Sequence, residues 1–171
     1  MISIIRIALI PLIVWLVLRG TTTAAWVAVV LYALGAASDG LDGYLARRHD
    51  LKTATGAWLD PLSDKLFVVG PAVALSLTGE FPWWATGIFA ARELAVTLLR
   101  WHLESRGGVS MPASWTAKAK TAAQLAAVGG AVAPLPAPWD PVVLTVAAVA
   151  ALLTLYTGAE YFLTTRHRVR S

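Results

Sequence analysis

Long apolar stretches alternate with short polar segments along this chain. The apolar stretches cover residues 4–18, 24–45, 57–77, 83–103, 117–133 and 141–163, and each is bounded by polar residues, glycine or proline. Stretches of this length and composition are typical of helices that cross a lipid bilayer. The pattern predicts an all-α integral membrane protein with six transmembrane helices and a single domain over residues 1–171.

The composition favours a membrane protein over a soluble one. Hydrophobic residues make up 57% of the 171 positions, and the mean hydropathy is +0.65. The chain has no cysteine, which excludes a disulfide framework and thiol chemistry. The sequence also lacks the common motifs of P-loop, dinucleotide-binding, zinc-protease and serine-hydrolase sites. The net charge of +4 is modest, and no nucleic-acid partner is expected.

Basic residues are distributed unevenly between the two sides of the predicted membrane. Of the 14 Lys and Arg residues, all except Arg19 fall on one side or within the adjoining ends of the helices. The segments on the other side, residues 20–23, 78–82 and 134–140, are nearly free of cations. The positive-inside rule then puts both termini and the segment around residues 47–52 in the cytoplasm. We expect a multi-pass protein of the inner (plasma) membrane, with a polar cavity that faces the cytoplasm.

Four aspartates lie at the cytoplasmic ends of the second and third apolar stretches. Asp39 and Asp42 are three residues apart, and Asp60 and Asp64 are four apart, so each pair shares one face of a helix. Two facing helices with two carboxylates each can form an all-oxygen cage, which suits Mg²⁺ or Mn²⁺. Near Asp42, Gly43 leaves the helix face bare, so that a ligand can approach the backbone.

The same carboxylates have a second interpretation. A charged side chain at this depth costs at least about 2.5–3.5 kcal/mol, so the aspartates need a neutralising partner. Ion pairs with Arg47, Arg48 and Lys65, or a proton relay in a transporter, would serve as well as divalent cations. The residues taken singly leave the choice between an enzyme and a transporter open.

The spacing of these residues resembles that of the CDP-alcohol phosphotransferases, which are integral membrane enzymes of phospholipid synthesis. Their pattern is D-x-x-D-G-x-x-A-R, eight residues, then G-x-x-x-D-x-x-x-D. This chain fills it without a gap, with Asp39, Asp42, Gly43, Ala46, Arg47, Gly56, Asp60 and Asp64.

The resemblance implies a reaction and roles for these residues. An acceptor hydroxyl attacks the lipid-linked phosphorus of CDP-diacylglycerol, and CMP leaves. Two ions of Mg²⁺ or Mn²⁺ would be held by Asp39, Asp42, Asp60 and Asp64, and Asp64 would also act as the general base. The cytidine nucleotide of the lipid would lie against Gly43, Ala46, Arg47 and Gly56. The resemblance further implies contact with membrane lipids and a homodimer.

A second group of residues concerns the acceptor. The stretches A-R-E at residues 91–93 and S-W-x-x-K-x-K-T-x-A-Q at residues 114–124 resemble the phosphatidylglycerophosphate synthase branch, which uses sn-glycerol 3-phosphate. That branch usually has Asn-x-x-Thr-x-x-Arg in its first helix. Arg6 fits the arginine and Ser3 the threonine, but this chain departs from the pattern because the asparagine position would fall before Met1. The acceptor phosphate would be bound by Arg92, Lys118 and Lys120.

Other interpretations of these residues stay open. Arg92 and the adjacent Glu93 can form an intramembrane ion pair that only neutralises both charges. Cardiolipin synthases of this fold, which accept phosphatidylglycerol, and phosphatidylinositol phosphate synthases share the core motif and also take anionic acceptors.

Overall fold

The computed structural model describes the backbone of residues 2–49, 54–105 and 115–170. Within these ranges, the side chains of residues 2–5, 39–49, 54–61, 104 and 166–170 lie outside the description. The described part of the chain is helical throughout, apart from the turns that join the helices, and it contains no strand.

Within the described ranges six α-helices form, one for each apolar stretch of the sequence, and most extend a few residues beyond it. The helices are α1 (Ile2–Leu18), α2 (Thr22–His49), α3 (Ala54–Thr78), α4 (Trp83–Glu104), α5 (Trp115–Val132) and α6 (Asp140–Arg170), and a single 3-10 turn, η1 (Ala137–Trp139), precedes α6. The prediction of six helices is therefore confirmed.

Glycines end two of the helices. Gly20 and Gly79 adopt φ angles of 64° and 83°, in the left-handed region that is costly for other residues. The amide of Gly20 donates to the carbonyl of Val17, and the amide of Glu80 donates to that of Leu75. These bonds satisfy carbonyl groups at the ends of α1 and α3, so the chain reverses direction within a few residues.

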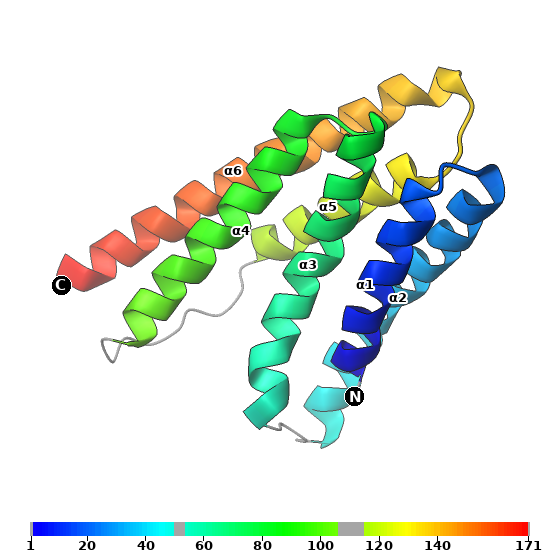
Figure 1. The fold of residues 1–171 in the computed structure, drawn as a ribbon. Helices are drawn as coiled ribbons and strands as arrows, with labels where there is room; N and C mark the ends of the chain where they lie inside the picture. The colour runs from blue at the N-terminus through cyan, green and yellow to red at the C-terminus, as the bar shows by residue number, and fades with distance from the viewer. Residues whose placement is uncertain (1, 50–53, 106–114, 171) are drawn as a thin grey trace.

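The helices run up and down through the molecule (Figure 1). The α1–α2, α3–α4 and α5–α6 turns lie at one end, and both termini lie toward the other. We call these the turn end and the terminal end. This alternation agrees with the predicted placement of both termini on one side of a membrane.

Small residues allow the helices to approach closely. α5 packs along α6, where Gly130 faces Val143, and the alanines Ala127, Ala131, Ala147 and Ala150 of these two helices are buried. α1 packs against both α2 and α3 through larger residues such as Ile13, which is fully buried. The resulting core joins all the described helices except for their terminal-end segments.

The outer surface is strongly apolar. Large side chains such as Leu77, Leu94, Leu152 and Tyr156 are more than half exposed. Among the described residues, only the segment Ala137–Thr165 is both long and apolar enough to qualify by itself as a membrane span, and Arg6–Leu18 and Thr22–Ser38 are shorter apolar helices. The helices α3, α4 and α5 carry charged residues that line an internal cavity, which lowers their overall hydropathy.

Candidate functional site

A cavity of about 750 Å³ lies between the helices, and all six contribute to its lining. Its volume is within the range of small-molecule sites. Three acidic side chains line it, Asp64, Glu93 and Glu160, and so do six basic ones, Arg6, Lys65, Arg92, Arg100, Lys118 and Lys120. The described lining therefore carries an excess of positive charge, which suits an anionic ligand.

The two helices that carry the aspartates meet at Gly35 of α2 and Phe67 of α3. A methyl group at position 35 would overlap the Phe67 ring, and that ring also stacks on Tyr32, with centroids 4.9 Å apart and planes 3° from parallel. Gly35 and Phe67 both line the cavity. Their contact fixes how closely α2 and α3 approach at this level.

Helical periodicity relates the aspartate positions to this contact. In α2, position 39 lies one turn toward the terminal end from Gly35, and position 42 lies one further turn along. In α3, position 64 lies one turn toward the terminal end from Phe67, and position 60 lies one further turn along. All four positions belong to helices that the structure describes, whereas the side chains of Asp39, Asp42 and Asp60 lie outside the description. The same holds for Gly43, Ala46, Arg47 and Gly56.

Of the four predicted metal ligands, Asp64, which is also the predicted base, is the one whose side chain the structure describes. It lines the cavity and forms an ion pair with Arg6 of α1, 58 residues away in sequence. The Arg6 side chain is 5% exposed and that of Asp64 is 45% exposed. Arg6 therefore approaches the carboxylate from the protein side, and the carboxylate remains accessible from the cavity.

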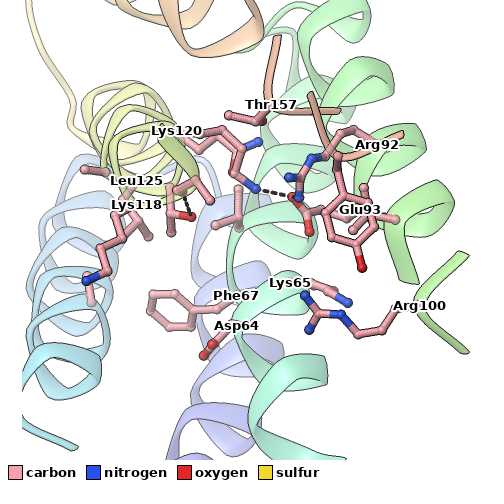
Figure 2. Close-up of a pocket in the computed structure, with 18 of the residues that line it drawn as sticks. Asp64, Lys65, Phe67, Arg92, Glu93, Arg100, Lys118, Lys120, Leu125 and Thr157 are labelled. Carbon is pink, nitrogen blue, oxygen red and sulfur yellow. Dashed lines mark hydrogen bonds and ion pairs between the residues drawn. The ribbon is translucent and has the colours of Figure 1, made fainter. Parts of the chain in front are cut away.

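A buried cluster of charges links α4 and α5. The Oε1 atom of Glu93 accepts hydrogen bonds from Nη1 of Arg92, at 3.0 Å, and from the ammonium of Lys120 (Figure 2). Glu93 is 8% exposed and Lys120 is 4% exposed. The intramembrane pair of Arg92 and Glu93 considered from the sequence is thus present, with Lys120 as a third member.

Besides Arg6, two cations of the cavity were not assigned to the site from the sequence. Lys65 is hydrogen-bonded to Thr97 of α4, and Arg100 lies near Lys65 in the cavity (Figure 2). Arg100 follows Arg92 by eight residues, so the two share a helix face. This spacing is the sequence feature from which Arg100 could have been assigned to the site. Lys65, Arg92 and Arg100 together form a basic wall along α3 and α4.

Lys118 lies apart from the other predicted acceptor residues. It is exposed and points away from Glu93, whereas Lys120 points toward it (Figure 2). Both lysines line the cavity. The structure therefore brings Arg92 and Lys120 together and leaves Lys118 on another side of the same cavity.

The described residues contain no group of three or more His, Asp or Glu side chains that could hold a metal ion. The side chains of three of the four predicted ligands lie outside the description, so the predicted metal set is not tested by this result.

Comparisons with known proteins agree with the sequence pattern. The sequence model of a family described as CDP-alcohol phosphatidyltransferase matches residues 1–158. A protein of Mycobacterium tuberculosis (strain ATCC 25618 / H37Rv) named "Probable phosphatidylglycerophosphate synthase" is 36% identical over 162 residues, which cover 93% of this chain and 77% of that protein.

Two enterobacterial proteins are also similar, and both are named CDP-diacylglycerol–glycerol-3-phosphate 3-phosphatidyltransferase. The protein of Shigella flexneri serotype 5b (strain 8401) is 34% identical and that of Escherichia coli (strain K12) is 32% identical. Each alignment spans 173 residues and covers 94% of this chain and 90% of the relative.

Proposed function

The chain belongs to the CDP-alcohol phosphatidyltransferase family, and we propose that it transfers the phosphatidyl group of CDP-diacylglycerol to sn-glycerol 3-phosphate. The products are phosphatidylglycerophosphate and CMP. The observation that carries this proposal is the similarity to phosphatidylglycerophosphate synthases over more than nine-tenths of the chain. The gap-free aspartate motif and the basic cavity agree with it.

The family is membrane-bound, and we place the chain in the inner membrane with all six helices across the bilayer. The apolar outer surface and the alternating helix directions support this placement. The concentration of basic residues toward the terminal end supports an active site that faces the cytoplasm. Two copies are proposed to form a homodimer, on the basis of the family resemblance.

The donor set fits Mg²⁺ or Mn²⁺. Positions 39, 42, 60 and 64 are all aspartates, and they follow the Gly35–Phe67 contact at successive turns of two helices. Hard carboxylate oxygens are the ligands that these cations prefer. Asp39, Asp42, Asp60 and Asp64 would hold two ions, which would neutralise the charge of the diphosphate and polarise its phosphorus.

Asp64 is proposed to be the general base. Its carboxylate accepts the proton of the attacking glycerol hydroxyl as the new oxygen–phosphorus bond forms and the bond to the CMP phosphate breaks. The ion pair with Arg6 supports this role, because Arg6 orients the carboxylate from the protein side and leaves it accessible from the cavity. The nucleotide of the lipid substrate would lie against Gly43, Ala46 and Arg47 in α2 and Gly56 in α3.

The acceptor phosphate is proposed to bind at the basic wall around Arg92. Glu93 neutralises only part of the charge that Arg92 and Lys120 carry, and Lys65 and Arg100 add two further cations nearby. Cations at membrane depth are costly unless an anion accompanies them. A phosphorylated acceptor supplies that anion. In this proposal Lys120 does not bind the phosphate itself but holds Glu93 in place against Arg92.

The experiment that tests this function measures CMP release by purified protein supplied with CDP-diacylglycerol, Mg²⁺ or Mn²⁺, and one acceptor at a time. The panel contains sn-glycerol 3-phosphate, phosphatidylglycerol, inositol phosphate and serine. We expect turnover with glycerol 3-phosphate and none without a divalent cation. Preference for phosphatidylglycerol would instead indicate a cardiolipin synthase, and preference for inositol phosphate a phosphatidylinositol phosphate synthase. Solute movement without CMP release would indicate a transporter.

A further inference from the structure

The two lysines of α5 serve different sides of the cavity. Lys118 and Lys120 are two residues apart, which corresponds to a rotation of about 200° around the helix axis. Lys120 is buried against Glu93, and Lys118 is exposed and points the other way (Figure 2). The ammonium of Lys118 therefore does not join the cluster around Arg92.

The face of α5 that carries Lys118 is the face that looks toward α2. Lys118, Ala122, Leu125 and Gly129 follow one another at intervals of four, three and four residues, so they share this face. At its far end Gly129 packs on α2, where a Cβ added to Gly129 would lie 3.4 Å from Cε1 of Tyr32. Lys118, Ala122 and Leu125 line the cavity.

The contact between Tyr32 and Gly129 sets the register of the two helices, which run in opposite directions (Figure 1). In α5, Lys118 lies eleven residues from Gly129 toward the terminal end. In α2, position 43 lies eleven residues from Tyr32 in the same direction. Eleven residues correspond to about 16 Å along each helix. Lys118 thus lies toward the terminal end from the Tyr32–Gly129 contact, as positions 39–43 do.

On α2 the same spacing of four, three and four residues joins Tyr32, Ala36 and positions 39 and 43 on one face. Ala36 lines the cavity, as Lys118 does. Positions 39 and 43 belong to the segment proposed to hold the metal ions and the nucleotide. Lys118 therefore borders the half of the cavity assigned to the lipid substrate.

We propose that Lys118 binds the diphosphate of CDP-diacylglycerol and that it does not contact the acceptor phosphate. This inference rests on the proposed function. A diphosphate carries concentrated negative charge, and a lysine ammonium with three rotatable donors is suited to it as a point charge. The acceptor phosphate is left to the basic wall of Lys65, Arg92 and Arg100, on the other side of Lys120.

The test compares Lys118→Gln with Lys118→Arg and with Lys65→Gln, a matched loss of charge on the opposite side of the cavity. For each variant we would measure the KM for both substrates and the binding of CDP-diacylglycerol in detergent without acceptor. Loss of a charge-assisted hydrogen bond typically corresponds to a tenfold or greater loss of affinity, so Lys118→Gln is expected to weaken CDP-diacylglycerol binding by roughly tenfold. Lys118→Arg is expected to retain it, and Lys65→Gln to raise only the KM for glycerol 3-phosphate.

A labelling measurement on the unaltered protein tests the same inference without any substitution, so it still decides if a variant does not fold. The amine of Lys118 is exposed, so an amine-reactive reagent should label it, and mass spectrometry can quantify the label. CDP-diacylglycerol is expected to protect Lys118, and glycerol 3-phosphate alone is not.

Several results would overturn the inference. One is an increase in the KM for glycerol 3-phosphate alone in Lys118→Gln. Others are unchanged binding of both substrates, a change confined to the Mg²⁺ requirement, or no protection of Lys118 by CDP-diacylglycerol. Because binding of the lipid substrate is measured without acceptor, these outcomes are separate from failure of the wild-type protein to use glycerol 3-phosphate.

Discussion

The ring of Phe67 packs directly on Gly35, at the level where α3 approaches α2, one turn from Asp39 along α2 and one turn from Asp64 along α3. No side chain at position 35 fits without displacing the ring. The absence of a Cβ at position 35 therefore lets the Phe67 ring of α3 lie against α2, and each of these two helices carries two aspartates.

We predict that Gly35→Ala lowers both stability and turnover. Overpacking of a filled site typically costs about 1–3 kcal/mol, and here the strain would also separate α2 from α3. Thermal unfolding in detergent and the Mg²⁺ dependence of CMP release would measure the two effects. Gly87→Ala is the matched control, because nothing lies within 4 Å of a Cβ at position 87. Adding Phe67→Leu to Gly35→Ala should recover part of the loss. A Gly35→Ala variant equal to its control would contradict this role of the contact.

For the proposed base, we expect Asp64→Asn to reduce turnover by roughly 10²–10⁴-fold, the range typical of a lost general base. Binding of CDP-diacylglycerol should be largely retained, because a base acts in the transition state and contributes little to the ground-state complex. Steady-state kinetics and direct lipid binding separate the two effects. Turnover close to that of the wild type would exclude Asp64 as the base.

The buried cluster of Arg92, Glu93 and Lys120 predicts that loss of the carboxylate lowers stability more than loss of the lysine. Glu93→Gln removes the carboxylate that both Arg92 and Lys120 contact, and leaving buried charges without a partner typically costs about 3–5 kcal/mol. Lys120→Met removes one cation and leaves Glu93 bonded to Arg92, so it should cost less. The midpoints of thermal unfolding should therefore rank wild type, then Lys120→Met, then Glu93→Gln. The reverse order of the two variants would show that Glu93 does not anchor the cluster.

The basic wall predicts a selective effect on the acceptor. Arg100→Gln should raise the KM for glycerol 3-phosphate several-fold more than the KM for CDP-diacylglycerol, since Arg100 lies beside Lys65 and away from Lys118 (Figure 2). Arg19→Gln is the control for lost charge, because Arg19 is exposed at the turn end, over the ring of Trp15. Equal effects of Arg100→Gln on both substrates would argue against an acceptor site at this wall.

The predicted orientation can be tested with single cysteines, because the chain contains none of its own. A cysteine at Ser105, near the terminal end, should be labelled by an impermeant thiol reagent only after the cells are opened. A cysteine at Ala137, at the turn end, should be labelled in intact cells. Labelling in the opposite pattern would reverse the orientation.

The sequence by itself determined the number of the helices, their approximate limits and the identity of the family. Apolar runs that end at glycine, proline or polar residues define helices through local physics, so the position of each helix could be read from the pattern, while α2 and α6 continue past their apolar runs into polar residues. The aspartate motif lies within two neighbouring helices, and its spacing alone gave the shared faces of Asp39 with Asp42 and of Asp60 with Asp64.

Only the tertiary structure decided which cations meet which anions. Arg6 reaches Asp64 across 58 residues, and Glu93 holds Lys120 across 27. Such partners depend on the rotation and register of packed helices, which the apolar pattern does not fix because the outer surface is apolar on many sides. The K-x-K stretch shows the difference most clearly. In sequence it is one basic patch, but packing of Gly129 on Tyr32 directs Lys118 toward α2, and Glu93 holds Lys120 toward α4.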